Sequence, residues 1–282
     1  MNKIILKFLI FLFSLIPLYF IQIIGILIGH IFNLLNARSR NLLIHNLTKS
    51  NIYSNKNDLK KAINKNIGET GKTILESLSI WLSKENRVLS WVKEVKGFDE
   101  VKKAQKNNKG IIFLTPHLGC YEIASIFYGN TKPLTVMYRK ARKTWLSDLM
   151  IKGRKKGLVN LASTDSKGLK KILMALKRSE AIGILPDQVA DKGNGEMANF
   201  FGRPAYTMVL INKLIQRTEA SIIMVYGERL RNGKGFDIHF ELINKKSVST
   251  SLGLNKELEL FIKKNPTQYY WSYDRFKKIT DK

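Results

Sequence analysis

The stretch Gly110-Ile-Ile-Phe-Leu-Thr-Pro-His-Leu-Gly-Cys-Tyr-Glu122 decides the fold class of this chain. It opens with a continuous apolar run over 111–115, which is typical of a strand buried on both faces. Further runs of this kind lie at 134–138, 181–185, 221–225 and 237–242, and helical patterns occur at 121–128, 144–156, 166–179, 206–219 and 257–264. Buried strands that alternate with helices predict an α/β fold with a covered, largely parallel central sheet.

Upstream of this region, apolar residues recur at helical spacing from Leu59 to Leu82 and predict an amphipathic helix, which Gly68 and Gly71 weaken in its middle. Residues 41–57 are polar and rich in Asn, so we expect a connector or a short helix there. No internal repeat or long linker interrupts the rest of the chain. Residues 38–282 are therefore interpreted as one domain.

Residues 1–37 are expected to form a membrane anchor. Phe8 to Ala37 contains no Asp, Glu, Lys or Arg, and about 20 apolar residues suffice for a helix to span a bilayer. A cleaved signal peptide has a shorter apolar core, of about 7–15 residues, and a small-residue cleavage site. A helix lying in the interface should carry charge on a polar face, which this segment lacks. An uncleaved, single-pass anchor is therefore predicted.

The flanking charges modestly favour a cytoplasmic body. Lys3 and Lys7 precede the apolar segment, whereas four basic residues follow it within 38–57: Arg38, Arg40, Lys49 and Lys56. Basic residues concentrate on the cytoplasmic side of membrane helices. The single cysteine excludes an internal disulfide and is compatible with a reducing compartment.

The net charge is +26, from 48 Lys and Arg against 22 Asp and Glu. An excess of this size favours a polyanionic partner, namely nucleic acid, an anionic membrane, or an acidic substrate or carrier protein. A drift of composition toward Lys is the alternative. A membrane-tethered nucleic-acid-binding protein stays open on charge alone, but no zinc-finger spacing, RNP-like aromatic motif or helix-turn-helix signature supports it, so nucleic acid is not an expected partner.

Sites in parallel sheets form at the carboxyl ends of the strands, where His117 follows the 111–115 run. Glu122 falls in the first turn of the next helix, from which its carboxylate can reach back to the imidazole. Such a carboxylate fixes the tautomer and raises the basicity of the ring, which then takes a proton from a substrate hydroxyl. A capping Glu and an idle loop His are the alternative. Cys120 is expected to be a small buried hydrophobe rather than a nucleophile.

Other polar residues follow the remaining strands. Arg139 comes after 134–138 with Lys140, Arg142 and Lys143 close behind, which suits a phosphate or carboxylate, although a solvated helix start fits too. Asp187 and Gln188 come after 181–185 and are expected at the rim of the site, or as turn residues.

Two aromatic segments have two interpretations each. Phe200-Phe201 before Gly202 and Arg203 suits either a wall for an acyl chain or a tight turn. Residues 269–273 hold four aromatic side chains, which suit either the membrane interface or packing across the sheet.

Together, and in this order, the motifs resemble the late acyltransferases of lipid A biosynthesis, the lauroyl/myristoyl transferase family acting on Kdo-bearing precursors, within the glycerolipid acyltransferase group that carries His-x4-Asp/Glu. The resemblance covers nearly the whole chain. Its motifs are Gly97-Phe98, Gly110 to His117, Tyr138-Arg139, Leu185-Pro186-Asp187-Gln188, Phe200-Phe201-Gly202 with Thr207, Pro266-x-Gln268-Tyr269-x-Trp271, and Arg275-Phe276-Lys277.

The chain departs from the family pattern at two places. The family often has His-Phe-Gly-Asn-Trp-Glu where this chain has His-Leu-Gly-Cys-Tyr-Glu over 117–122, and it usually has a His before the Arg-Phe-Lys triplet, where Ser272-Tyr273-Asp274 has none. These departures leave the expected reaction type unchanged. They concern which acceptor is used and which acyl chain length is selected.

The resemblance implies a single glycerolipid-acyltransferase-like α/β domain that moves a fatty acyl group from acyl carrier protein to a hydroxyl of a 3-hydroxyacyl chain. His117 would be the general base and Glu122 its orienting partner. Arg139 would bind a phosphate or the oxyanion, to which backbone donors near Gly119 would contribute. Asp187, Gln188 and Arg203 would contact the acceptor.

The implied partners are acyl carrier protein, an anionic lipid acceptor and the inner membrane, with the catalytic domain on its cytoplasmic side. No metal or cofactor is expected, since acyl carrier protein supplies the donor. A lysophospholipid, aminolipid or glycolipid acceptor is the nearest alternative, and an inactive scaffold is a more distant one.

Overall fold

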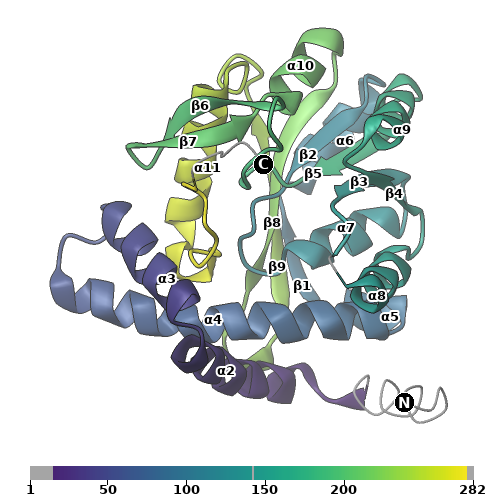
Figure 1. Ribbon diagram of the computed structural model, residues 1–282. Helices are drawn as coiled ribbons and strands as arrows, with labels where there is room; N and C mark the ends of the chain where they lie inside the picture. The colour runs from purple at the N-terminus through teal and green to yellow at the C-terminus, as the bar shows by residue number, and fades with distance from the viewer. Residues whose placement is uncertain (1–14, 142, 278–282) are drawn as a thin grey trace.

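The computed structural model describes residues 15–141 and 143–277 and places a seven-stranded sheet at the centre of the protein (Figure 1). The strand order is β1-β9-β8-β2-β5-β3-β4, and all neighbours pair in parallel except β8 and β9. In chain order the strands are β1 Val92–Lys96, β2 Ile111–Leu114, β3 Leu134–Tyr138, β4 Val159–Ser163, β5 Ala181–Ile184, β8 Ser221–Arg229 and β9 Phe236–Ile243. The predicted α/β fold with a largely parallel sheet is confirmed.

The five strands expected from apolar runs are all present, and the sheet gains β1 and β4 at its two edges. The residues of β1 are partly or fully exposed, and the sequence of β4 is interrupted by the exposed Asn160. Neither segment has the continuous apolar character by which the buried strands were found. Edge strands are paired on one side only and carry a weaker pattern.

Helices cover both faces of the sheet (Figure 1). Successive side chains of β2 point to opposite faces, so that Ile111 and Phe113 join one buried cluster whereas Ile112 and Leu114 join the other. The first face packs against α5, α6 and α7, and the second against α9, α10 and α11. The bounds are α5 Glu85–Ser90, α6 Phe98–Lys106, α7 Tyr121–Gly129, α8 Thr144–Arg154, α9 Ser166–Lys177, α10 Leu210–Arg217 and α11 Ser251–Lys264.

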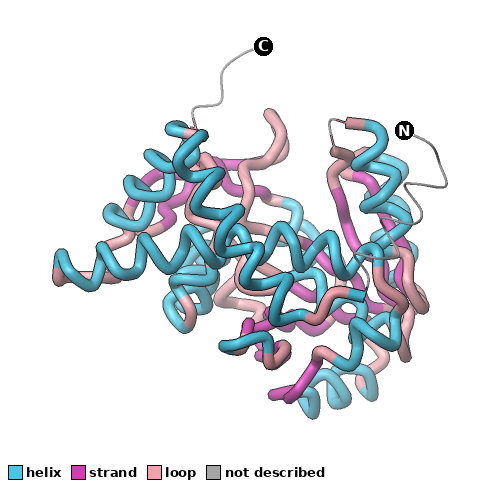
Figure 2. Tube along the Cα trace, turned by 90° about the horizontal axis from the view of Figure 1, so that it is seen from below, coloured by secondary structure: helices cyan, strands magenta, loops and turns pink. Residues whose placement is uncertain are grey.

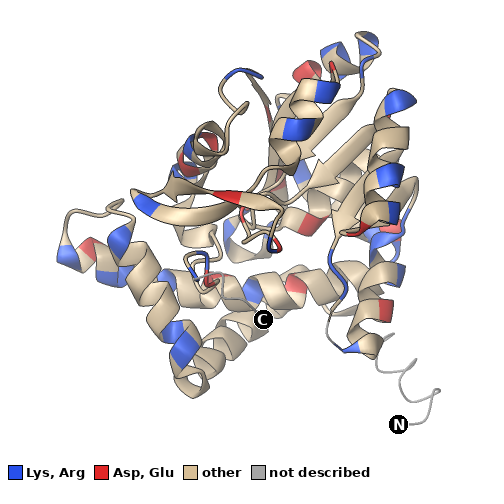
Figure 3. Ribbon diagram, turned by 45° about the horizontal axis from the view of Figure 1, so that its top comes forward, with Lys and Arg blue, Asp and Glu red and all other residues tan. Residues whose placement is uncertain are grey.

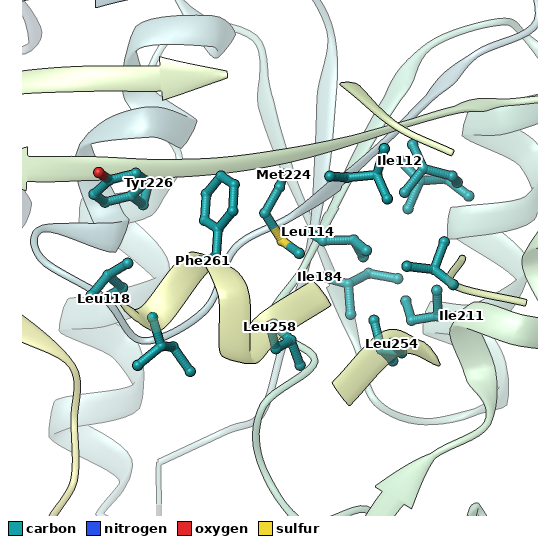
Figure 4. Close-up of a cluster of buried hydrophobic side chains, with 14 of the residues drawn as sticks. Ile112, Leu114, Leu118, Ile184, Ile211, Met224, Tyr226, Leu254, Leu258 and Phe261 are labelled. Carbon is teal, nitrogen blue, oxygen red and sulfur yellow. The ribbon is translucent and has the colours of Figure 1, made fainter. Parts of the chain in front are cut away.

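The second cluster joins the centre of the sheet to α11. Leu114, Ile184 and Met224, which come from three neighbouring strands, point toward Leu258 and Phe261 of that helix (Figure 4). All five side chains are buried. Burial of each such side chain contributes about 1.5–3 kcal/mol, and this layer fixes β2, β5 and β8 side by side.

A two-stranded hairpin, β6 Gly195–Phe200 and β7 Arg203–Met208, lies outside the main sheet. The helix expected over 206–219 is therefore wrong at its start, because α10 begins only at Leu210. Phe201 and Gly202 turn the hairpin with φ of 47° and 71°. Two central residues of positive φ match the right-handed twist of paired strands.

Three helices form the base of the molecule: α2 Leu18–Leu35, α3 Ala37–Lys49 and α4 Lys56–Leu82. Figure 2, seen from below, shows α2 lying over α4. The predicted helix over 59–82 is confirmed as α4, and α3 fills the first part of the expected connector. By length and composition α2 can cross a membrane. Residues 1–14 of the expected anchor, and Arg142 of the basic cluster, lie outside the described residues.

Glycines bring α2 and α4 into backbone contact. A Cβ added at Gly71 would lie 2.0 Å from the Gly25 oxygen, and one at Gly29 would lie 2.3 Å from the Ile67 oxygen. Small residues let helices approach this closely. Gly71, which weakens α4 as an isolated helix, is therefore required by its packing.

Replacing Gly71 by Ala is expected to lower the free energy of unfolding by at least ~2 kcal/mol, because the backbones must separate. The matched control is Gly68→Ala, whose Cβ would meet only Ile26 side-chain atoms at 3.4 Å or more. Both changes raise helix propensity equally, so thermal unfolding in detergent isolates the clash. Equal melting temperatures for the two variants would refute the close contact.

Candidate active site

The carboxyl ends of three neighbouring strands bring the site together. His117 follows β2, Asp187 and Gln188 follow β5, and Arg139 follows β3, while β5 pairs in parallel with both β2 and β3. The expectation that polar residues after buried strands share one edge is confirmed for these four residues.

Asp187 holds the imidazole of His117. Its Oδ1 lies 2.8 Å from His117 Nδ1, and its Oδ2 accepts a hydrogen bond from the His117 backbone N–H at 2.9 Å. An ionised carboxylate can only accept a hydrogen bond, here from Nδ1–H, so this contact assigns the tautomer that leaves Nε2 as the unprotonated nitrogen. Asp187 therefore positions and polarises the ring.

The Asp187 carboxyl is 2% exposed. Burial raises its pKa, but the charge of His117 and the two hydrogen bonds from that residue outweigh burial and hold the pKa of Asp187 below its ordinary value of 3.8. Asp187 is thus ionised at neutral pH. Both oxygens of Asp187 bond to His117. The structure therefore assigns Asp187 to positioning of His117, in place of the expected contact with the acceptor.

Gln188 occupies the other side of the ring, with its Nε2 3.1 Å from His117 Nε2. In the tautomer set by Asp187, this amide donates to the lone pair that a general base uses. Adjacent residues of one loop thus contact both ring nitrogens. A substrate hydroxyl that reaches Nε2 must take the place of the Gln188 amide.

The turn after His117 is held by two distant segments. Gly119 adopts φ of 61°, its N–H donates to Gln268 at 3.0 Å, and a Cβ there would lie 2.1 Å from the Gly227 oxygen. The His117 carbonyl accepts from Tyr270 N–H at 3.0 Å. Only glycine combines this φ with this approach, so the turn places His117 by backbone contacts.

The structure corrects the expected contact between Glu122 and His117. Glu122, which is 3% exposed, accepts hydrogen bonds from Arg154 Nε at 3.0 and 2.9 Å and pairs with its Nη2 as well. The start of α7 is bound to β8 through Cys120 N–H and the Gly227 oxygen, 2.8 Å apart. This attachment directs Glu122 beneath the helix, into a cavity of about 40 Å³ lined by apolar residues such as Phe113 and Val136.

Replacing Glu122 by Gln is expected to lower the free energy of unfolding by about 2–3 kcal/mol, because Arg154 then stays buried without a counter-charge. The exposed Glu196, on β6, gives the matched control Glu196→Gln. Chemical denaturation of the two variants measures the difference. A Glu122→Gln protein that kept its stability and lost only turnover would contradict a structural ion pair.

A cavity of about 590 Å³ opens beside His117. Its walls include Arg139, Arg154 and Lys213 together with apolar side chains, among them Met137, Met150, Leu169, Leu185 and Met208. The volume and the mixed lining are those of a site for a ligand with an apolar chain and a polar head. Arg139 bonds to Asp191 at 2.8 Å and is half exposed, so an anionic group can reach it.

Arg203 lies outside this cavity lining. Its guanidinium stacks on the Phe276 ring at 3.6 Å from the centroid and donates to Asn46 of α3 at 3.1 Å. The structure thus does not bring Arg203 together with His117, and its predicted contact with the acceptor lacks support from the geometry.

Most of the two aromatic segments packs in the core, but Tyr270 is exposed and Tyr273 is partly buried. Phe200 and Phe201 are buried at the hairpin turn, and Tyr269 and Trp271 are 5% and 3% exposed. Of the two interpretations given for each segment, the structure supports the tight turn at 200–202 and packing in the domain for Tyr269 and Trp271. Tyr269 also pairs with Leu118 as an isolated bridge, so this segment supports the catalytic turn.

Cys120 is buried, and burial raises the pKa of its thiol well above the usual value. The residue is therefore a protonated small side chain, as the sequence indicates, and not a thiolate nucleophile.

Within residues 15–141 and 143–277, one group of side chains has metal-ligand spacing: Glu228, Asp237 and His239. Their charges already have partners, since His239 bonds to Glu228 at 2.8 Å and Lys96 bonds to Asp237 at 3.1 Å. A satisfied ion-pair cluster explains them without a metal.

A family model described as "Bacterial lipid A biosynthesis acyltransferase" matches residues 4–278. The lipid A biosynthesis palmitoleoyltransferase of Escherichia coli (strain K12) is 26% identical over 223 residues, which cover 77% of this chain and 72% of that protein. The lauroyltransferase of the same strain is 25% identical over 224 residues, with the same coverage of 77% and 72%. The lipid A biosynthesis myristoyltransferase of the same strain is 20% identical over 183 residues, which cover 62% of this chain and 56% of that protein.

Proposed function

Because the chain belongs to the bacterial lipid A biosynthesis acyltransferases, and is thus an acyltransferase, we propose that it moves a fatty acyl group from acyl carrier protein to a hydroxyl of a 3-hydroxyacyl chain on a Kdo-bearing lipid A precursor. The observation that carries the proposal is His117, held by Asp187 at Nδ1 with Nε2 at a cavity of about 590 Å³.

The proposed step needs no nucleophile from the protein. The acceptor hydroxyl replaces the Gln188 amide at His117 Nε2 and gives its proton to that nitrogen. Its oxygen then bonds to the thioester carbonyl carbon of the donor. The carbon–sulfur bond breaks, and the leaving thiolate takes the proton back from His117. Asp187 stabilises the imidazolium while it exists.

Charge at the cavity supports an anionic ligand. Arg139 stands at the wall with half of its side chain exposed, and Arg154 is fixed there by Glu122. Arg139 is proposed to bind a phosphate of donor or acceptor, where its planar donors match the oxygens. The Gly119 turn is proposed to contribute to oxyanion stabilisation.

The protein's charge of +26 supports acidic partners. Acyl carrier protein, a phosphorylated acceptor and an anionic inner leaflet are all of this kind, and both substrates are expected at the cytoplasmic face. Figure 3 shows Lys and Arg spread over the outer helices of the domain. Association is therefore expected to weaken as salt rises.

The test uses washed membranes that contain the folded protein. Acyl carrier protein loaded with C10–C16 chains and a Kdo-bearing tetraacyl precursor are supplied, and products are identified by mass. One added acyl chain supports the proposal and gives the chain preference. Absence of product with this acceptor, together with acylation of a lysophospholipid, aminolipid or glycolipid, would reject the proposed acceptor and keep the chemistry.

A further inference from the structure

The apolar helix α2 has one face covered by the protein and the other uncovered. Its buried residues are Leu18, Ile21, Gln22, Gly25 and Gly29. The exposed large apolar side chains on and beside it are Tyr19, Phe20, Ile23, Ile24, Ile26, Leu27, Ile28, Ile31, Phe32, Leu34 and Leu35. A continuous exposed apolar surface of this kind marks a contact with a membrane or another protein.

The covered face is joined firmly to the domain. A Cβ at Gly25 would lie 2.7 Å from Lys72 Cα, so the backbones of α2 and α4 touch. Gln22 donates to Glu76 at 2.9 Å and accepts from the Gly233 N–H at 3.1 Å. Glu76 is completely buried and also binds Arg229 of β8. A network of buried polar groups thus connects the second turn of α2 to the sheet.

A bilayer-spanning α2 is incompatible with these contacts. If α2 stood upright with α4 attached, exposed Lys65 of α4, six residues from the Gly71 contact, would enter the hydrocarbon, at a cost of up to about 2.5–3.5 kcal/mol. If α2 separated from α4, Glu76 would lose the Gln22 hydrogen bond, and the glycine-lined backbones would lose their contact. Burial of polar groups without partners costs about 1–3 kcal/mol each.

An in-plane orientation satisfies both faces of α2. A lone helix in the interface needs a charged face toward water, but here α4 and the short helix η1 Arg231–Gly233 cover that side. The elements α4 and η1 thus cover the side of α2 that would otherwise need a polar face toward water. A helix of about 10 Å diameter fits the depth of about 5–10 Å that interfacial helices reach.

Basic residues border α2 at both ends. Arg87 donates to the Ile16 oxygen before the helix, and Arg231 and Lys234 are exposed beside Tyr19, which Gly233 contacts. Arg38 and Arg40 follow its last turn. With α2 parallel to the surface, these cations lie together at the headgroup level of one leaflet, where each that has no acidic partner contributes about 1 kcal/mol with anionic lipid. Arg38 also pairs with Asp274 at 3.1 Å.

We propose that α2 lies in the plane of an anionic phospholipid bilayer, with its exposed apolar face in the acyl region of one leaflet, in place of the single span expected from the sequence. This orientation concerns how the protein is held and does not depend on the acyl acceptor. It makes α2, α4 and the sheet one rigid body at the membrane surface.

The test measures the depth of labels on one stripe of α2. Single cysteines replace Phe20, Leu27 or Leu34 in a Cys120→Ala background of the full chain, and each carries an environment-sensitive fluorophore. All three positions are exposed and lie seven residues apart, on one face. The vesicles contain phosphatidylcholine and phosphatidylglycerol with quenchers at known depths. Exposed Lys61 of α4, labelled in the same way, is the aqueous control.

Equal and shallow depths at the three positions are expected. A spanning helix would instead place residues 20 and 34 at opposite interfaces, about 21 Å apart along the axis, with residue 27 deepest, and would overturn the proposal. Three labels in water would overturn it as well and indicate a protein partner on this face. Binding to pure phosphatidylcholine should be at least ~10-fold weaker, and equal binding would refute the anionic surface.

Discussion

Replacement of His117 by Ala is expected to lower the rate of acyl transfer by about 10²–10⁴-fold, because the acceptor hydroxyl would lose the proposed general base. Position 117 lies on a loop whose backbone contacts to Asp187 and Tyr270 do not need the ring. The backbone of the loop should therefore be retained, while loss of the Nδ1 hydrogen bond to the buried Asp187 should lower the free energy of unfolding by about 1–3 kcal/mol. Product is quantified by mass, at saturating donor and acceptor.

His45 on α3 provides the matched control, since its side chain is exposed and lies on another element. His45→Ala should transfer at the wild-type rate. Equal rates from His117→Ala and wild type would show that another group is the base. A His117→Ala protein that is unfolded at the assay temperature would instead assign the loss of activity to folding.

Replacement of Asp187 by Asn is expected to lower turnover by about 10²-fold or more, with a smaller effect on KM. The amide can present N–H groups to His117 Nδ1, which forces the proton onto Nε2 and removes the free lone pair. Steady-state kinetics of wild type and Asp187→Asn, with Asp99→Asn on α6 as the exposed control outside the cavity, measure the effect. A change in KM alone would assign Asp187 to acceptor binding.

Acid stability gives a second measurement on the same variant. The pKa of Asp187 is lowered in the folded state, so the stability from its ionised form is complete above its ordinary pKa of 3.8 and is lost as pH falls through the lower folded value. Wild type should therefore lose stability below about pH 4. Asp187→Asn should lose less over that range, because it has no carboxylate to protonate.

The residues of the site were readable from the sequence, but their pairing was not. His117 and Asp187 each follow a buried strand, and that position indicates the site. Which strands are neighbours depends on the order of the sheet, and β2 and β5 are far apart in the chain. The His-x4-Glu spacing therefore predicted Glu122 as the partner of the His117 imidazole. In the structure Asp187 is that partner, because β5 pairs with β2.

The ion pair between Arg154 and Glu122 could not be predicted from the sequence. Arg154 ends a helix whose pattern resembles any amphipathic helix, and only the packing of α8 near α7 makes the ion pair. For the aromatic residues 269–273 the sequence left two interpretations open. Tyr and Trp suit a membrane interface and a domain core equally well, so composition alone does not distinguish the two.

One loop both lines the cavity and holds the base. Leu185, Gln188 and Val189 border the cavity of about 590 Å³, while Asp187 and Gln188 contact the two nitrogens of His117. Under the proposed reaction, with the acyl chain of the donor in this cavity, a chain that fills it poorly would leave the loop, and with it the His117 imidazole, displaced from the acceptor hydroxyl. Misplacement of about 1 Å costs about 100-fold in rate. Discrimination between donors of different chain length is thus expected to appear in kcat more than in KM.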